Sequence, residues 1–310
     1  MNIHPSTSSG RTVGVLLNQH SKQLEAALSL DAGSARIEVQ CLLQAVLQMN
    51  RAWLLARPEH LLDDEQYARY IALFERRMGS EPLAYILGER EFFGLNFMVS
   101  PATLIPRPET ELLVELALQR IPQPLPSSLT PPGLPLSGKE RRGMNKFRVL
   151  DLGTGSGAIA LSIAHARPDI EVVAVDTSQD ALEVARENAL RLNIGNVRLL
   201  QSDWFSALGG ERFDLIVANP PYIADGDAHL TRGDLRFEPL SALVSGADGL
   251  DDIRSICAHS KTHLNSGGWL LFEHGYDQAS LVRALLQQSG FVGIFSARDL
   301  SGIERVSGGI

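Results

Sequence analysis

Residues 219–222 of this 310-residue chain read Asn-Pro-Pro-Tyr and follow the apolar run FDLIVA at 213–218. Because proline has no N–H to donate to a sheet, a strand that enters this motif must end there. The Asn219 side-chain oxygen and the Pro220 carbonyl can accept hydrogens from a nitrogen whose lone pair is delocalised. Such a nitrogen must become pyramidal to attack a methyl group, and acceptors fixed in advance favour that transition state. The motif therefore predicts N-methylation, with Tyr222 offering a face to a planar group, whereas the alternative is a proline-stopped strand with an asparagine turn.

A glycine-rich loop at residues 151–158 reads Asp-Leu-Gly-Thr-Gly-Ser-Gly-Ala. Glycines there allow positive φ angles and let a ligand approach the backbone closely. The spacing also satisfies the dinucleotide fingerprint, so the loop alone is compatible with a nicotinamide cofactor, S-adenosylmethionine or a structural turn. Hydride transfer has no evident use for Asn-Pro-Pro-Tyr, and the two motifs together therefore favour S-adenosylmethionine. The candidate cofactor-binding residues of the loop are Gly153, Thr154, Gly155, Ser156 and Gly157.

Polar and aromatic residues follow the next two apolar runs. Asp176 lies 23 residues after the first glycine of the loop, where a carboxylate can accept both hydroxyls of a ribose. The alternative role for Asp176 is a helix N-cap, which Thr177 or Ser178 could provide instead. Trp204 could line an adenine pocket or pack as an ordinary aromatic. Because ligands of open α/β sheets bind outside the carboxyl ends of the strands, we expect the glycine loop, Asp176, Trp204 and Asn219 to converge.

The elements that must carry these residues alternate between strand and helix from residue 147 onward. Near-continuous apolar strands that alternate with amphipathic helices predict an α/β fold with a parallel sheet covered on both faces. The expected strands are 148–152, 171–176, 197–201, 213–218, 268–273 and 291–297. The expected helices are 157–166, 178–192, 249–264 and 277–289.

The residues before 147 are expected to form a smaller, helical part. An N-cap and acidic first turn at 63–65 precede apolar residues from Tyr67 to Met78 at three- and four-residue spacing, and Gly79 ends that helix. A hairpin is expected at 91–105, and a helix follows it. The expected divisions are a loose N-terminus (1–14), a helical domain (15–90), the hairpin and connecting helix (91–121), a proline-rich flexible loop (122–146) and the catalytic domain (147–310).

Composition and charge limit the classes of function. The formal net charge is −8, and residues 1–100 hold nine Lys/Arg against eleven Asp/Glu, so no basic footprint for nucleic acid is visible. The basic cluster Lys139, Arg141, Arg142 and Lys146 is expected to be solvated, with contact to RNA or an acidic partner as the alternative. The two cysteines and eight histidines form no metal-ligand spacing. With no signal-peptide pattern and no long apolar window, a cytoplasmic protein is expected.

With these motifs, the chain closely resembles the protein-(glutamine-N5) methyltransferases that modify peptide chain release factors. The resemblance covers roughly 20–121 and 147–307, with ordered matches at 81–88 (EPLAYILG), 90–92 (REF), 105–111 (IPRPETE), 151–157, 202–205 (SDWF), 219–222, 237–240 (FEPL), 273–275 (EHG), Arg298, Asp299, Gly302 and Arg305. Related enzymes acting on ribosomal protein L3 share the glycine loop and Asn-Pro-Pro-Tyr but usually have Pro-Arg-Ser-Pro before the catalytic domain. PRPETE at 106–111 therefore indicates the release-factor branch.

The resemblance implies a small N-terminal helical bundle that helps to recognise the substrate, followed by a Rossmann-like, class I S-adenosylmethionine-dependent methyltransferase domain with a seven-stranded mixed sheet. By position, Gly153 to Gly157, Asp176, Trp204 and Asn219 would contact the cofactor. Residues 219–222 would hold the glutamine of the Gly-Gly-Gln motif, with Asn219, Pro220 and Tyr222 as the catalytic residues. The implied partners are release factors 1 and 2, and the product is S-adenosylhomocysteine. A monomer is expected, without membrane association or stable nucleic-acid binding.

Two other functions fit parts of the pattern. An adenine-N6 nucleic-acid methyltransferase could hold an exocyclic base amine with the same tetrapeptide, but it would need a basic surface for backbone phosphates. A non-catalytic module that binds release factors would keep its cofactor only for stability. The intact glycine loop, Asp176 and Asn219 argue against the second alternative.

Overall fold

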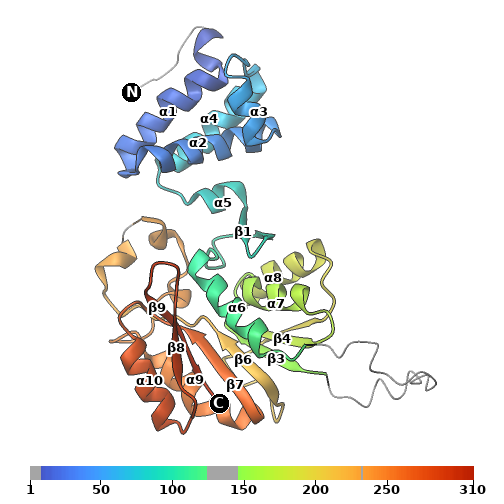
Figure 1. The fold of residues 1–310 in the computed structure, drawn as a ribbon. Helices are drawn as coiled ribbons and strands as arrows, with labels where there is room; N and C mark the ends of the chain where they lie inside the picture. Colours follow the sequence, from blue (N-terminus) through green and yellow to red (C-terminus); the bar gives the residue numbers. More distant parts are fainter. Residues whose placement is uncertain (1–7, 124–145, 232) are drawn as a thin grey trace, which may run out of the picture. The chain divides into compact units, whose positions relative to one another are not determined.

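The computed structural model describes residues 8–123, 146–231 and 233–310 (Figure 1). The chain separates into two compact units: one contains 1–88 with 231–237, and the other contains 89–230 with 238–310. Nearly all of the predicted proline-rich loop, and its basic cluster except Lys146, lie outside the described residues. Within those residues, no helix combines the length and hydropathy that crossing a membrane would need.

The first unit is built from helices, of which α1 to α5 share one apolar core. They are η1 (Ser8–Arg11), α1 (Val13–Leu28), α2 (Ala32–Leu47), α3 (Arg51–Ala56), α4 (Asp64–Met78) and α5 (Leu83–Leu87). The Asp63 side chain accepts from Gln66 N, and the Gln66 side chain accepts from Asp63 N, which forms a capping box at the start of α4. Tyr70 and Phe74 on α4 pack into the core. The predicted acidic start of this helix is confirmed. α1 begins within the predicted loose N-terminus.

The second unit contains a seven-stranded sheet with the order β5-β4-β3-β6-β7-β9-β8. Its strands are β3 (Arg148–Leu152), β4 (Glu171–Asp176), β5 (Val197–Gln201), β6 (Phe213–Ala218), β7 (Leu264–Glu273), β8 (Phe295–Arg298) and β9 (Glu304–Gly309). Neighbouring strands from β5 to β7 pair in parallel, whereas β9 is antiparallel to both of its neighbours. The mixed seven-stranded sheet confirms the predicted fold class.

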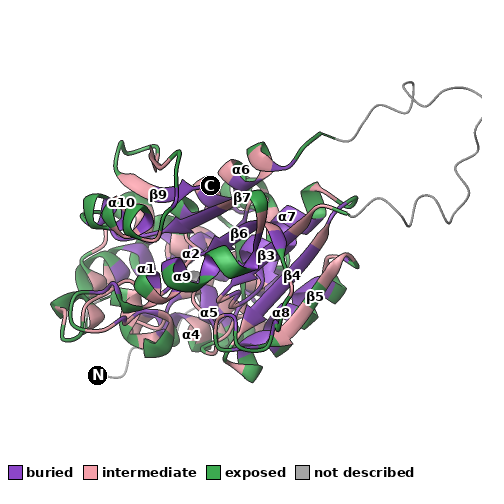
Figure 2. Cartoon of the chain, turned by 90° about the horizontal axis from the view of Figure 1, so that it is seen from below, coloured by how far each residue is buried: buried purple, intermediate pink, exposed green. Residues whose placement is uncertain are grey.

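Helices cover both faces of this sheet. They are α6 (Glu111–Arg120), α7 (Ala158–Ala166), α8 (Gln179–Arg191), α9 (Asp251–His263) and α10 (Ala279–Gln288). Alternate strand residues divide between two cores, so that Val149 packs with α6 and α7 while Leu150 packs with α9 and α10. The strands β3 and β4 are therefore buried along most of their length, and the outer strand β5 is only partly buried (Figure 2).

Several predicted boundaries differ from the structure. The hairpin is formed by β1 (Glu89–Phe92) and β2 (Leu95–Met98), so its expected range of 91–105 was displaced toward the C-terminus. β8 begins four residues after the expected 291, and β7 begins at Leu264 instead of 268. β9 was not predicted by residue, because two glycines end its sequence. A Cβ atom on Gly308 would lie 2.4 Å from the Leu270 carbonyl oxygen, so close strand packing requires that glycine.

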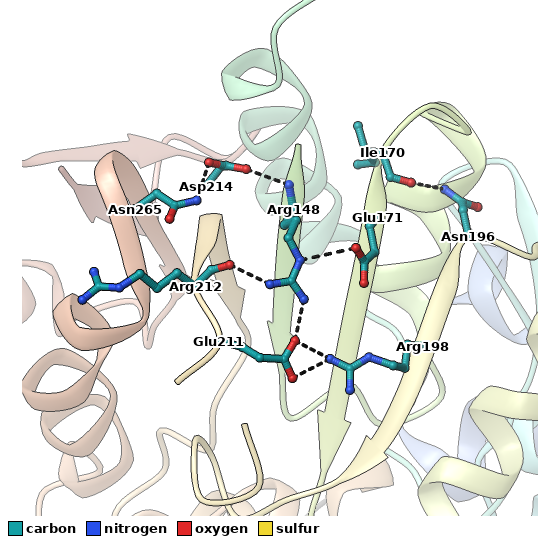
Figure 3. A network of polar contacts seen from close by, with 9 residues as sticks. All are labelled: Arg148, Ile170, Glu171, Asn196, Arg198, Glu211, Arg212, Asp214 and Asn265. Atoms are coloured by element: carbon teal, nitrogen blue, oxygen red, sulfur yellow. Dashed lines mark hydrogen bonds and ion pairs between the residues drawn. The ribbon is translucent and has the colours of Figure 1, made fainter. Parts of the chain in front are cut away.

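A polar network joins the amino ends of the central strands (Figure 3). Arg148 pairs with Glu211 at 2.5 Å and with Glu171 at 3.4 Å, and its backbone N–H donates to Asp214 at 2.8 Å. Asn265 Nδ2 donates to the other oxygen of Asp214 at 2.7 Å. We call these residues, with Arg198, the amino-end network. Both oxygens of Asp214 are thus used by the protein itself.

Candidate active site

A cavity of about 330 Å³ lies within the second unit, at the carboxyl ends of the parallel strands. Its lining includes most of the predicted site residues: Gly153, Thr154, Gly155, Ser156, Asp176, Trp204, Asn219 and Pro221. Gly157, Pro220 and Tyr222 do not line it. The expected convergence of four strand ends on one site is therefore confirmed, although individual ligand contacts remain predictions.

The glycine loop is anchored to the neighbouring strand by its backbone. The N–H groups of Gly153 and Thr154 both donate to the Val175 carbonyl at 2.9 Å. Gly155 has a φ of 55°, and a Cβ atom added there would meet no atom within 4 Å, so the loop faces open space. Gly157 has a different role, because it is the N-cap of α7 and a Cβ atom there would lie 2.9 Å from Leu161.

Asp176 is held in place by two backbone donors. Its Oδ2 accepts from Gly155 N at 2.8 Å, and its Oδ1 accepts from Ser178 N at 2.9 Å. The N-cap of α8 is Ser178, whose hydroxyl accepts from Ala181 N at 3.2 Å. Asp176 is therefore not needed as the helix cap. Each carboxylate oxygen keeps a further lone pair that can accept a hydroxyl proton.

Trp204 adopts a left-handed backbone conformation with a φ of 44°, which is costly for a bulky residue. The Ser202 hydroxyl stabilises this turn, since it donates to the Trp204 carbonyl at 2.9 Å and accepts from Ala207 N at 3.0 Å. The indole ring lies against the glycine loop, where a Cβ atom on Gly153 would be 3.5 Å from it. The strained turn thus places an aromatic wall beside the loop.

The Asn-Pro-Pro-Tyr motif is fixed by side chains around it, including Thr110, which also lines the cavity. Asn219 Nδ2 donates to Thr110 Oγ1 at 3.3 Å, and the Tyr222 hydroxyl donates to Glu273 Oε1 at 3.3 Å. Gln278 Nε2 donates to the Tyr222 carbonyl at 3.0 Å. Gly249 packs against the same carbonyl, and a Cβ atom there would be only 2.3 Å from the oxygen. These contacts give the motif a defined backbone position.

Another part of the cavity wall was not predicted as part of the site, although its segments were among the matches to the family. It comes from residues 102–107 and 239–242. Arg107 forms an ion pair with Glu238, whose side chain is fully buried and also accepts from Ile105 N at 3.4 Å. PRPETE and FEPL were the sequence signals of these segments, but nothing local in the sequence indicates that they pair.

Two buried carboxyl groups lie close behind the cavity. Burial raises the pKa of Asp151 to about 7, against the hydrogen bond that Thr154 Oγ1 donates to it at 2.7 Å. Burial also raises the pKa of Glu273 to about 7, against the hydroxyls of Thr110 and Tyr222. One oxygen of each group, Asp151 Oδ1 and Glu273 Oε2, has no hydrogen-bond partner among the described residues. Hydrogen-bond acceptors without a described partner are therefore present at this end of the sheet.

The residues of the cavity fit S-adenosylmethionine. The open space beside Gly155 accommodates a ligand chain against the backbone, Asp176 presents acceptors for ribose hydroxyls, and Trp204 presents an aromatic face for adenine. Within the described parts of the chain, no group of three or more His, Cys, Asp and Glu side chains could hold a metal ion. The lining residues thus fit an organic cofactor, and Asn219 belongs to the same lining.

Comparisons with known proteins agree with this geometry. Residues 139–234 match the family model of the methyltransferase small domain, and residues 16–88 match that of the PrmC N-terminal domain. Among solved structures, the catalytic domain of hMettl16 in complex with MAT2A 3'UTR hairpin 1 has a TM-score of 0.51 at 13% identity, covering 80% of each chain. That similarity concerns the fold alone.

Curated relatives are much more similar in sequence. The release factor glutamine methyltransferase of Salmonella typhimurium is 46% identical over 279 residues, which cover 90% of this chain and 93% of that protein. The Escherichia coli protein of the same name is 46% identical over 284 residues, covering 91% and 95%. The Pseudomonas aeruginosa protein is 47% identical over 277 residues, covering 89% and 93%. With both units matched along nearly their whole length, the chain belongs to the family of release factor glutamine methyltransferases.

Proposed function

We propose that this protein transfers a methyl group from S-adenosylmethionine to the side-chain amide nitrogen (N5) of the glutamine in the Gly-Gly-Gln motif of peptide chain release factors 1 and 2. The single observation that carries the chemistry is the orientation of Asn219. Its amide N–H is engaged by Thr110, so its Oδ1 is left as an acceptor in the cavity lining. Release factor glutamine methyltransferases are 46% identical to the chain, which supports the choice of substrate.

The cofactor would be held by the glycine loop, Asp176 and Trp204. When bound, S-adenosylmethionine supplies a methyl group whose bond to sulfur breaks as the glutamine nitrogen attacks and loses a proton to solvent, leaving S-adenosylhomocysteine. Asp176 orients the ribose with oxygens that are already fixed by Gly155 and Ser178, so little reorganisation accompanies binding. Trp204 excludes water from one side of the site.

The substrate amide would be held by the Asn-Pro-Pro-Tyr motif. Asn219 Oδ1 and the Pro220 carbonyl accept the two N–H hydrogens, which become stronger donors as the nitrogen turns pyramidal. Pro221, which lines the cavity, and Tyr222 restrict where the planar amide lies. Because the methyl group is already activated, correct positioning accounts for most of the catalytic effect.

The two units would divide recognition and chemistry. We propose that the helical domain at 15–90 contributes to recognition of the release factor, and that residues 147–310 carry out the transfer in a monomeric, cytoplasmic enzyme. The acidic balance of the helical domain supports a protein substrate over DNA or RNA.

A labelling experiment tests the proposal. The protein is incubated with methyl-labelled S-adenosylmethionine and one of four acceptors: intact release factor, release factor with the Gly-Gly-Gln glutamine replaced, ribosomal protein L3, or DNA. Label on the intact factor alone is the expected result. Label on L3 or DNA would assign a different substrate, and no label on any acceptor would contradict an active enzyme.

A further inference from the structure

Glu273 lies next to the catalytic motif, behind Thr110, and is not itself part of the cavity lining. It is the last residue of β7, and its side chain is buried, with 2% of the residue exposed. β6 and β7 pair in parallel with Ala218 opposite Phe272, so the residues that follow, Asn219 and Glu273, leave the sheet side by side. A buried carboxyl group costs stability unless it is paired, so its presence here needs an explanation.

Hydroxyl donors surround this carboxyl group. The Tyr222 hydroxyl donates to Oε1 at 3.3 Å. The Thr110 hydroxyl is near enough to lower the pKa of Glu273. The Glu273 Oε2 atom has no hydrogen-bond partner among the described residues, so it can accept the Thr110 proton. Thr110 Oγ1 in turn accepts from Asn219 Nδ2 at 3.3 Å. Thr110 therefore lies between Glu273 and Asn219.

The single proton of the Thr110 hydroxyl gives this arrangement a direction. A threonine hydroxyl has one proton to donate, while it can accept at its lone pairs. If that proton points to the Glu273 carboxylate, the oxygen can only accept from Asn219. The Asn219 amide must then turn its NH₂ group toward Thr110 and leave Oδ1 for a ligand. If the proton points the other way, it favours an Asn219 amide rotated by about 180°, which presents NH₂ to the substrate.

We propose that Glu273 is a positioning residue for methyl transfer: through the proton of Thr110 it holds the Asn219 amide with Oδ1 toward the substrate nitrogen. This inference rests on the proposed function, because it assigns a purpose to the orientation that glutamine methylation needs. A rotated Asn219 would turn its own NH₂ group toward the NH₂ group of the substrate glutamine. The substrate amide would then lose one of its two acceptors.

The charge of Glu273 controls the direction of the proton. Burial raises its pKa to about 7, the hydroxyls of Thr110 and Tyr222 and the charge of Arg305 lower it, and the charge of Glu109 raises it further. The neighbouring His274 faces elsewhere, with contacts to Gly275 O and Ser307 Oγ at 2.9 Å. When Glu273 is protonated it becomes a donor to Thr110, and the chain can reverse. Turnover should therefore fall as the pH decreases through about 7.

A matched pair of variants at Thr110 tests the role of the proton. Thr110→Val keeps the shape but removes the hydroxyl, and kcat should fall about tenfold, which corresponds to the loss of one hydrogen bond. Thr110→Ser keeps the hydroxyl and should stay within about threefold of wild type. Calorimetric titration with S-adenosylhomocysteine reports whether each variant still folds and binds cofactor. Equal kcat values for the valine and serine variants would contradict the proposal.

The pH profile separates Glu273 from the other buried carboxyl group. Wild-type kcat, measured at saturating substrates from pH 6 to 8.5, should show an inflection near pH 7. Glu273→Gln should abolish that inflection, whereas Asp151→Asn should keep it, although the pKa of Asp151 is raised to a similar value. An unchanged inflection in Glu273→Gln would overturn the assignment. Because wild-type labelling of the release factor is measured first, failure of the proposed function would be recognised separately.

Discussion

The carboxyl groups at the amino ends of the parallel strands differ in their partners from the carboxyl groups at the carboxyl ends of the same strands. At the amino ends, Glu211 pairs with Arg148 and Arg198, and both oxygens of Asp214 accept hydrogen bonds from the protein. At the carboxyl ends, Asp151 and Glu273 are buried and each keeps an oxygen without a described partner. At the amino ends these carboxylates are paired within the protein. At the carboxyl ends, the buried carboxyl groups keep oxygens that can accept a hydrogen bond from a ligand or take up a proton.

This difference separates stability from function within one sheet. Charges that satisfy one another, as in the amino-end network, can stabilise the fold but offer nothing to a substrate. Groups whose partners are incomplete cost stability, and they persist where a function uses them. Matched substitutions at the two ends of the strands should therefore have different consequences.

The largest expected difference concerns two asparagines. Asn219→Ala should lower kcat by about 10²-fold or more, because an acceptor aimed at the transition state is lost, while cofactor affinity is retained. Asn265→Ala in the amino-end network should leave kcat unchanged and reduce the free energy of unfolding by about 1 kcal/mol. Steady-state labelling of release factor and urea unfolding measure the two effects. Near-normal turnover of Asn219→Ala would remove the basis for the mechanism.

Two aspartates provide the next comparison. Asp176→Ala should weaken cofactor binding about tenfold or more, because a fixed carboxylate that accepts ribose hydroxyls is removed. Asp214→Ala removes a carboxylate at the opposite ends of the strands that also accepts two hydrogen bonds, from Arg148 N and Asn265 Nδ2, and it should lower stability without changing cofactor affinity. Calorimetric titration with S-adenosylhomocysteine distinguishes the two. Unchanged affinity in Asp176→Ala would refute the ribose assignment.

The smallest expected difference is the pH dependence of stability. The pKa of Glu273 is raised from 4.5 to about 7. Its contribution to the free energy of unfolding is therefore complete below pH 4.5, where the group is protonated, and is lost as the pH rises toward 7. Burial acts to raise the pKa of Glu211, but Arg148 and Arg198 outweigh it and lower that pKa, so its contribution is present above 4.5 and lost on acidification. The two ends of the strands should therefore respond to pH with opposite signs.

Urea unfolding of two glutamine variants measures this effect. At pH 8, Glu273→Gln should be more stable than wild type, because it removes a buried ionised carboxylate. Glu211→Gln should be less stable by about 1 kcal/mol at pH 7, and the difference should disappear in acid. If the two substitutions changed the free energy of unfolding at pH 8 in the same direction, the two carboxyl groups would not be in contrasting environments.

The strands that position the site could be predicted from the sequence because their apolar runs are continuous and end in turn-forming residues. The predicted bounds of β3, β4, β5 and β6 are those of the structure. Glycine loop, Asp176 and Asn219 could also be brought together, since topology alone places the ends of parallel strands side by side. β9 could not be predicted in this way, because Gly308 serves close packing against β7 and not local strand preference.

The contacts that support the site could be recognised only from the structure. Asn219 and Thr110 are 109 residues apart, and Arg107 and Glu238 are 131 apart, so no local pattern connects them. Tyr222 was predicted to offer its ring to the substrate, but its hydroxyl is engaged by Glu273 and its side chain is absent from the cavity lining. Its contact with the glutamine stays a prediction.

The packing of Gly249 against the Tyr222 carbonyl has a consequence for how such a chain can diverge. A single methyl group at residue 249 would collide with the backbone of the catalytic motif, and the φ of 74° adds a second obstacle. By contrast, Gly209 and Gly226 meet nothing within 4 Å and are limited by backbone angle alone. In a library of random variants, residue 249 should therefore be as intolerant as Asn219. Selection at this residue would act against any side chain, because the absence of a Cβ atom is what the catalytic motif requires, although Gly249 itself takes no part in the reaction.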